Sequence, residues 1–142
     1  MKNKKGITSV ITIIFITISF LIIILSFFIM NIFKINMETY KVKKDLFYIV
    51  QNTYLNLNSK ELIYNNYVFN INEMKEKVQI LLNKNINNVE NIKIEEMKYE
   101  NNYIYIVLNI KIKPAFKMFN YDNINIKIHD NVKIKMLEVK NE

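Results

Sequence analysis

The side chains that most readily perform acid–base chemistry are few in this chain of 142 residues. The single histidine, His129, stands beside Asp130, and two carboxylates, Glu95 and Glu96, are also adjacent. Adjacent residues on a strand point to opposite faces of a sheet, so neither pair brings its two groups to one substrate unless a bulge realigns Glu95 and Glu96. A catalytic triad needs a nucleophile and a base within hydrogen-bond reach, and no spacing here signals one. The sequence therefore predicts that the protein is not an enzyme.

The composition also argues against a metal or cofactor site. The chain has no cysteine, which excludes disulfides and cysteine-based zinc sites. Its one glycine cannot form the glycine-rich loop that cradles phosphate groups. We therefore predict no catalytic residues, no metal ligands, no cofactor and no small-molecule substrate.

The formal charge of +7 is concentrated in the N-terminal part of the chain. Residues 1–5 contain three lysines, and residues 34–45 contain four lysines against two acidic residues. From Leu46 onward, the chain contains 13 lysines and 11 acidic residues, so its charge is nearly balanced. Positive charge on both sides of an apolar segment is typical of a membrane span rather than of a nucleic-acid-binding surface. We predict a membrane, and no nucleic acid, as a partner.

The apolar segment between these lysines runs from Ile7 to Phe33 and contains no charged residue. As a helix of 27 residues it would be about 40 Å long, more than the bilayer's hydrocarbon core of about 30 Å. Its hydroxyl side chains can bond to carbonyls of their own helix, so they cost little in lipid. A cleaved secretory signal has an apolar region of only about 7 to 15 residues. The sequence therefore predicts a retained transmembrane helix over residues 7–33.

The orientation is predicted from the lengths of the two flanking segments. Residues 1–6 form a short basic leader with Lys2, Lys4 and Lys5. A short basic tail is readily kept in the cytoplasm, whereas a long following domain can be translocated whatever its charge. We expect a single-pass protein of the cell membrane with a cytoplasmic N-terminus and an extracytoplasmic C-terminal domain.

Residues 34–58 are expected to continue the helix as an amphipathic segment, because no proline or glycine interrupts residues 7–57. Apolar residues recur at a spacing of seven, with two more at an intervening position: Phe33, Tyr40, Phe47 and Tyr54, then Val50 and Leu57. This stripe could pack against neighbouring subunits in a bundle, or it could cover the protein's own sheet. We favour the second alternative, because a small sheet needs a helix on its apolar face.

Residues 59–142 are predicted to form a small α+β head. An asparagine-rich connection over residues 56–70, either a short strand or irregular, precedes a second, short helix that Asn70 or Asn72 can cap. The apolar face of that helix is formed by five residues: Ile71, Met74, Val78, Leu81 and Leu82. The expected fold is thus a long N-terminal helix, first membrane-spanning and then amphipathic, packed with one short helix on a small antiparallel sheet.

The sheet is predicted from a change to a period of two. Alternation that begins at Ile92 shifts its parity after Glu95 and Glu96, which indicates a bulge. Residues 100–102 form a turn, and the clearest strand follows and ends before Pro114.

The last predicted strand, over residues 124–136, is either one strand with an irregularity at Asp130 or two strands. The opposite face of the sheet carries five lysines: Lys111, Lys113, Lys127, Lys133 and Lys135. Such a row could meet an anionic partner, but it is more often the solvated side of a half-buried sheet.

The order of these features resembles that of the type IV pilin-like proteins, and most closely the small TadE-like minor pilins and pseudopilins of tight-adherence (Tad-type) systems. The shared features are a short lysine-rich leader, the glycine in KKGITSVITIIF, an uncharged helix of membrane length and a small β-rich region. The resemblance implies cleavage by a prepilin peptidase after Gly6, which leaves Ile7 as the mature N-terminus. Members usually carry a glutamate five residues after the glycine, where this chain has Ile11. Equally, the lysines and the glycine could be the ordinary flank of an uncleaved anchor.

The resemblance implies a structural function. We expect a membrane-anchored minor pilin-like subunit of a bacterial pilus or secretion-type envelope assembly, whose partners are the membrane and other pilin-like or assembly subunits. The alternative is an uncleaved single-pass scaffold or adaptor protein whose head binds a protein partner. An intact N-terminus on the membrane-extracted protein favours this alternative.

Overall fold

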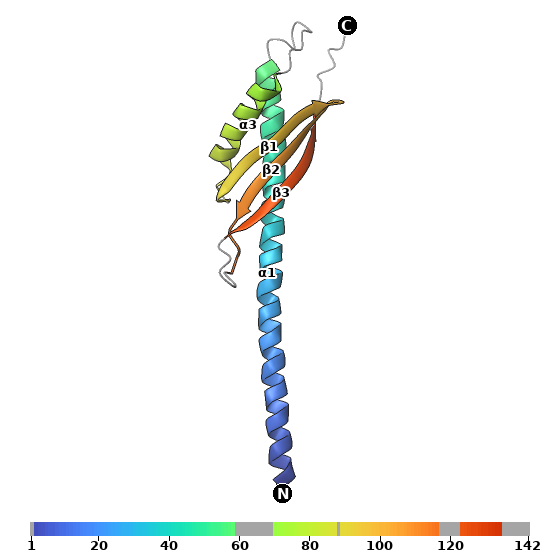
Figure 1. The fold of residues 1–142 in the computed structure, drawn as a ribbon, viewed down its shortest axis with the longest axis vertical. Helices are drawn as coiled ribbons and strands as arrows, with labels where there is room; N and C mark the ends of the chain where they lie inside the picture. Colours follow the sequence, from blue (N-terminus) through green and yellow to red (C-terminus); the bar gives the residue numbers. More distant parts are fainter. Residues whose placement is uncertain (1, 59–69, 88, 117–122, 135–142) are drawn as a thin grey trace.

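The computed structural model describes residues 2–58, 70–87, 89–116 and 123–134. Over these residues the chain has an α+β fold, as predicted: two helices lie against one face of a three-stranded antiparallel sheet. The first helix extends far beyond the sheet, so that the molecule has a long shaft below a small head (Figure 1). We call residues 8–33 the shaft, and the described residues from Val42 onward the head.

Helix α1 runs without a break from Lys2 to Asn58, which is 57 residues. At 1.5 Å per residue it is about 85 Å long. Neither proline nor a second glycine interrupts it, and the predicted hydroxyl bonds are present. Thr12, Thr17 and Ser26 each donate to the carbonyl four residues earlier, at 2.8–2.9 Å. The expected helix from the apolar segment into the amphipathic segment is therefore confirmed.

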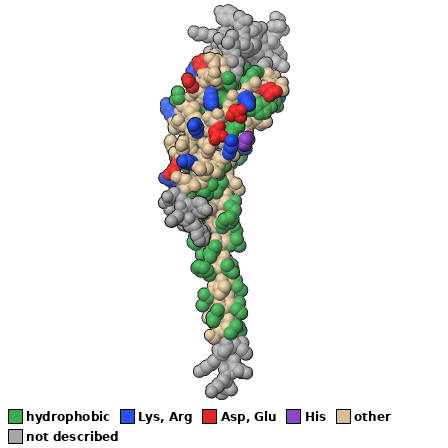
Figure 2. All heavy atoms as spheres, in the orientation of Figure 1, with side chains coloured by type: hydrophobic (Ala, Val, Ile, Leu, Met, Phe, Trp, Pro, Cys, Tyr) green, Lys and Arg blue, Asp and Glu red, His purple; other side chains and the backbone are tan. Residues whose placement is uncertain are grey.

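The backbone of α1 is helical throughout, but the exposure of its side chains changes along its length. Within the shaft only Ser19, Phe27 and Asn31 are half-buried, and every other residue is exposed. Figure 2 shows hydrophobic side chains along the shaft and charged ones gathered on the head. The core residues of α1 begin at Val42, so the helix changes from an exposed rod to a packed element over about two turns.

The aromatic residues at a spacing of seven do not share one environment. Tyr54 is 3% exposed and belongs to the core, whereas Phe33, Tyr40 and Phe47 are 71%, 70% and 45% exposed. A repeat of seven drifts by about 20° per heptad around a helix of 3.6 residues per turn, so Tyr54 is turned by about 60° from Phe33. The prediction that this stripe covers the sheet is therefore wrong for Phe33, Tyr40 and Phe47. It is confirmed for Tyr54 and Val50, which are buried, and for Leu57, which is partly buried against the core. Three residues outside the stripe complete the packed face of α1: Val42, Leu46 and Ile49.

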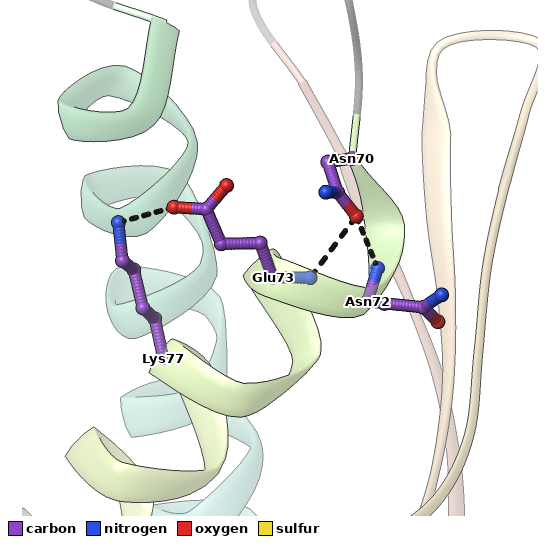
Figure 3. A network of polar contacts seen from close by, with 4 residues as sticks. All are labelled: Asn70, Asn72, Glu73 and Lys77. Atoms are coloured by element: carbon purple, nitrogen blue, oxygen red, sulfur yellow. Dashed lines mark hydrogen bonds and ion pairs between the residues drawn. The ribbon is translucent and has the colours of Figure 1, made fainter.

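Helix α3, Ile71–Asn85, is the predicted second helix, and it begins at the predicted cap. The Oδ1 atom of Asn70 accepts hydrogen bonds from the backbone N–H groups of Asn72 and Glu73, at 3.1 and 3.2 Å (Figure 3). One turn later, Lys77 pairs with Glu73 at 2.8 Å. The predicted apolar face packs on α1 and β1, and three of its five residues are buried: Met74, Val78 and Leu82. The connection predicted over residues 56–70 lies largely outside the described residues.

Strands β1 (Asn91–Glu100) and β2 (Tyr103–Ile112) form a hairpin. Asn101 and Asn102 have φ angles of 49° and 65°, the left-handed pair that a tight two-residue hairpin turn requires. Both residues are asparagines, which tolerate this region better than other residues with a Cβ. The predicted bulge is confirmed, because the register shifts between Ile94 and Glu96.

Strand β3, Ile124–Lys133, pairs with β2 in unbroken antiparallel register. The alternative of two strands is therefore wrong for the described residues, and Asp130 sits half-buried within one strand. The inward positions of β2 are all buried, as predicted, and they form the centre of the core: Ile104, Ile106, Leu108, Ile110 and Ile112. Lys135 and Met136, which were included in the last predicted strand, lie outside the described residues.

Candidate functional site

The residues that could perform acid–base chemistry lie apart on the sheet. His129 is exposed, whereas Asp130 points to the other face, and its Oδ1 accepts from the backbone N–H of Asn131 at 2.9 Å. In the part of the chain that the structure describes, no three His, Cys, Asp or Glu residues come together as metal ligands could. His129 and Asp130 therefore diverge, as predicted, whereas the bulge leaves both Glu95 and Glu96 exposed.

The carboxylates at the bulge are paired with basic side chains. Glu95, the extra residue of the bulge, contacts Lys127 at 2.7 Å and accepts a hydrogen bond from Asn109 at 3.1 Å. The hydrogen bond from Lys127, and then that from Asn109, holds the pKa of Glu95 below its ordinary value. Glu96 pairs instead with Lys98, and that contact lowers the pKa of Glu96 and raises the pKa of Lys98.

The lysine face of the sheet is a mixed-charge surface. Lys113 pairs with Glu90 at 2.9 Å, and this contact lowers the pKa of Glu90. Lys111, Lys113, Lys127 and Lys133 are all exposed. Figure 2 shows basic and acidic side chains interspersed over the head. This arrangement fits the solvated side of a half-buried sheet better than a binding site for one type of charge.

The shaft is the most distinctive feature of the described surface. Its helix is long and apolar enough to cross a membrane, and none of its most apolar stretch is buried. Large side chains around the whole circumference are more than half exposed, among them Phe15, Phe20, Leu21 and Phe28. Gly6 and Ile7, the predicted processing residues, lie in the first two turns of α1. The shaft and these two residues form the candidate anchor.

A second surface is formed by aromatic residues on α1 that point away from the head. Two positions after each of three of these aromatics, Phe33, Tyr40 and Phe47, stands a residue that faces the head. Two positions correspond to a rotation of about 200° around the helix. Those head-facing residues are Ile35, Val42 and Ile49. Tyr48, which we did not predict, is 55% exposed, and its ring lies 5.7 Å from that of Phe47 in an edge-on arrangement. We call Phe33, Tyr40, Phe47 and Tyr48 the aromatic surface.

Where the shaft meets the head, the segment after β2 reaches down along α1. The backbone N–H of Phe116 donates to Oδ1 of Asn31 at 2.9 Å, and Nδ2 of Asn31 donates to the Phe116 carbonyl at 3.1 Å. The rings of Phe116 and Phe27 lie 4.7 Å apart. This contact was not predicted, although Asn31 is the one amide in the uncharged run and was therefore a visible signal.

Beside this contact lies an apolar groove of about 530 Å³. One wall is the face of α1 from Leu21 to Ile35, and the other is formed by Pro114, Phe116 and Ile124. Among the described residues that line it, Asn31 alone has a polar side chain, and both ends of its amide are bonded to Phe116.

Protein-family models, curated proteins and solved structures contain no match to this chain. Function is therefore inferred from the shaft, the aromatic surface, the groove and the head.

Proposed function

We propose that the chain is a membrane-anchored, pilin-like (TadE-like) structural subunit of a bacterial pilus or secretion-type envelope assembly. The observation that carries the proposal is the division of α1: one unbroken helix is exposed and uncharged over residues 8–33 and then holds the head on one face. The pilin-like group, as noted from the sequence, has this arrangement of a shaft and a small head.

An exposed apolar shaft requires a nonaqueous environment. Soluble monomers rarely expose contiguous apolar patches of more than a few hundred Å², and the shaft is apolar on all sides. A bilayer can cover all sides of one helix, and so can the packed helices of other subunits. In the proposed function the shaft occupies the membrane first and contacts other shafts after assembly.

The proposed orientation places the leader in the cytoplasm and the head outside the cell. The leader contains Lys2, Lys4 and Lys5, and positively charged segments next to a membrane span tend to stay in the cytoplasm. The head follows the span as a long domain of nearly balanced charge, which can be translocated.

The proposed contact with neighbouring subunits is the aromatic surface. Phe33, Tyr40 and Tyr48 are more than half exposed, and Phe47 is 45% exposed at the flank of the packed face of α1. Aromatic side chains contribute large apolar area and dominate the energetics of many protein interfaces. The alternative in which the seven-residue stripe meets neighbouring subunits thus fits Phe33, Tyr40 and Phe47 better than contact with the protein's own sheet.

Processing after Gly6 is tested by the mass of the protein from a host that contains a prepilin peptidase. We expect the wild-type chain and the leader variant Asn3→Leu to lose residues 1–6, and the variant Gly6→Leu to keep them. The Asn3→Leu control changes the same leader without changing the cleaved bond. A wild-type protein that keeps its full mass in this host contradicts the processing.

Assembly through the aromatic surface is tested by disulfide cross-linking, since the chain has no cysteine of its own. The variant Tyr40→Cys should cross-link between copies or to assembly subunits in the membrane. Lys41→Cys is the matched control, because it is exposed at nearly the same height but turned by about 100°. Equal cross-linking of the two variants contradicts a specific contact at Tyr40.

The second candidate is an uncleaved single-pass scaffold or adaptor whose head binds a protein partner. The observation that favours it is Ile11, which stands where members of the pilin-like group usually have glutamate and is 61% exposed. A wild-type chain with an intact N-terminus, together with no cross-linking through Tyr40, would support this candidate.

A further inference from the structure

The segment after β2 contacts α1 well below the core of the head. Asn31 and Phe27, the residues that hold Phe116, precede Val42, the first core residue of α1, by 11 and 15 positions. At 1.5 Å per residue, this contact lies about 16 to 22 Å below the beginning of the core. The contact is therefore at the level of the shaft.

This level coincides with one boundary of a bilayer that surrounds the shaft. About 20 helical residues cross the hydrocarbon core. Counted from Ile7, the first residue of the uncharged run, they end near Ser26. Phe27 and Phe116 then lie at the edge of the hydrocarbon, with Asn31 and Lys34 at the level of the lipid headgroups. The lower half of the groove, formed by residues 21–28, lies in the hydrocarbon.

The hydrogen bonds of Asn31 suit that location. Phe116 is in a non-helical, non-strand segment, so its backbone N–H and C=O have no regular partner. In water such groups can be solvated, but near the hydrocarbon they must find partners inside the protein. The Asn31 amide satisfies both groups at once, at 2.9 and 3.1 Å. The non-helical backbone is thereby compatible with a nonpolar environment.

We propose that the groove holds an acyl chain of a membrane lipid, and that residues 114–116 form a second membrane contact of the head. This inference rests on the membrane-anchor part of the proposed function and not on its pilin-like part. The groove is continuous with the exposed apolar surface of the shaft, so a lipid beside the shaft can enter it sideways. Its volume of about 530 Å³ lies within the usual range of ligand sites.

The groups around the groove match the two ends of a phospholipid. The described walls are apolar apart from Asn31, whose amide is already bonded, so these residues offer an acyl chain no unmatched polar group. Lys34 follows the last residue of the uncharged run and is half-buried at the headgroup level. Its ammonium group can meet a lipid phosphate, as basic residues next to a span commonly do.

The depth of the head segment can be measured with tryptophan, because the chain has none. Full-length variants with a single tryptophan are placed in vesicles of phosphatidylcholine and phosphatidylglycerol whose acyl chains carry a spin-label quencher. Ala115→Trp reports on the head segment and leaves Phe116 and its contacts in place, and Phe20→Trp reports on the shaft. Tyr105→Trp, on an exposed position of β2, is the control on the head.

We expect strong quenching of Phe20→Trp and Ala115→Trp, and little quenching of Tyr105→Trp. If Ala115→Trp is quenched as weakly as Tyr105→Trp while Phe20→Trp is quenched strongly, the shaft is in the membrane but residues 114–116 do not contact it. The inference of a second membrane contact is then wrong. If Phe20→Trp is not quenched, the membrane anchor itself fails.

The occupant of the groove is identified by photocross-linking of the wild-type protein to a phosphatidylcholine with a photoreactive acyl chain. Lipid adducts on Ile124, which lies on the head side of the groove, support an acyl chain there. Adducts confined to the shaft overturn that assignment.

Discussion

At the scale of single residues, Asn31 makes the most specific polar contact between shaft and head. Replacing it by alanine removes both hydrogen bonds to Phe116. Phe116 is exposed in the isolated chain, but in the proposed location a bilayer covers its backbone. A backbone group left unsatisfied there costs about 1–3 kcal/mol, and every 1.4 kcal/mol corresponds to a factor of about ten in an opening equilibrium. We predict that Asn31→Ala speeds hydrogen exchange at the Phe116 amide by about tenfold or more, measured by mass spectrometry in vesicles. Asn36→Ala, at an exposed asparagine of the same helix, should leave that rate unchanged.

Glu38 is a buried carboxylate just below the core. It is 7% exposed, its Oε1 is 3.6 Å from the Lys41 ammonium, and none of the described residues gives its Oε2 a hydrogen-bond partner. Desolvation of a buried charge costs free energy, and one distant partner does not fully offset that cost. We predict that Glu38→Gln leaves the free energy of unfolding unchanged or raises it by about 1 kcal/mol, as measured by urea denaturation in detergent micelles. Glu76→Gln, on an exposed face of α3, serves as the control. A loss of more than about 2 kcal/mol in Glu38→Gln would identify the carboxylate as a stabilising group.

Sequence reasoning at this scale succeeded where the chemistry is local. Asn70 caps α3, and Asn101 and Asn102 form the turn, because an asparagine side chain or backbone acts on its immediate neighbours. Asn31 was missed because its partner, Phe116, is 85 positions away in the chain. No periodicity in the sequence reports such a contact.

At the scale of elements, two leucines in the C-terminal part of α1 provide a matched pair, one on the packed face and one on the exposed face. Leu46 is fully buried, whereas Leu55 on the same helix is 38% exposed. Truncation of a buried leucine to alanine costs about 2–5 kcal/mol because it leaves a cavity as well as removing apolar contacts. We predict a loss of about 3 kcal/mol for Leu46→Ala and of about 1 kcal/mol or less for Leu55→Ala, measured by denaturation of the full chain in micelles. Similar losses in both variants would contradict the assigned core face of α1.

The ion pairs on the outer face of the sheet predict a dependence of stability on pH. The pKa of Glu95 is lowered in the folded protein by Lys127 and then Asn109, from an ordinary value of 4.5. A carboxyl whose pKa is lowered on folding stabilises the fold at pH values above the unfolded pKa, and that contribution disappears as the pH falls through the folded pKa. We therefore predict that the wild-type protein has a larger free energy of unfolding than Glu95→Gln. This difference should be constant above about pH 5 and should decrease below it. Denaturation midpoints at several pH values measure this difference.

The size of that advantage should be small, since the pair is partly exposed to solvent. Salt screens such pairs, so the advantage should also shrink at about 1 M sodium chloride. An advantage that persists at low pH would indicate that Asn109 and Lys127 act on Glu95 through packing rather than charge.

The elements themselves were largely predictable, and one helix face was not. Alternation of apolar residues predicted β2 and its inward face, and a parity change predicted the bulge at Glu95. The aromatic residues of α1 were misjudged because a spacing of seven looks like one face in the sequence, but it turns steadily on a real helix. The core instead uses smaller residues around Leu46, which the bulkier aromatic pattern obscured.

At the scale of the whole molecule, the shaft and the head should be separable. All described core residues lie at or after Val42, so a fragment of residues 34–142 retains every one of them. We predict that this fragment folds and remains in aqueous solution without detergent, whereas the full-length chain needs detergent or lipid. Sedimentation together with circular dichroism measures both properties. A fragment that aggregates or lacks sheet structure would mean that the shaft contributes to folding of the head.

The overall arrangement was predictable because it depends on coarse features. An uncharged run of membrane length, an unbroken helix and a period of two at the C-terminal end are visible without any tertiary information. The descent of residues 114–116 along the shaft, and the groove that it creates, depend on how far the sheet is displaced along α1. That displacement follows from side-chain packing between segments that are distant in the sequence. It could therefore not be predicted from the pattern of apolar and polar residues.

The continuity of α1 has a mechanical consequence. Because the helix enters the head without a hinge, axial tension applied at the N-terminal end is transmitted along one backbone to the core. There the load acts in shear, parallel to the interface between the helix and the sheet, and not by peeling strands apart one at a time. A force applied to the shaft would thus reach the head through one continuous helix, and sideways bending of the head would have to break the Asn31–Phe116 hydrogen bonds.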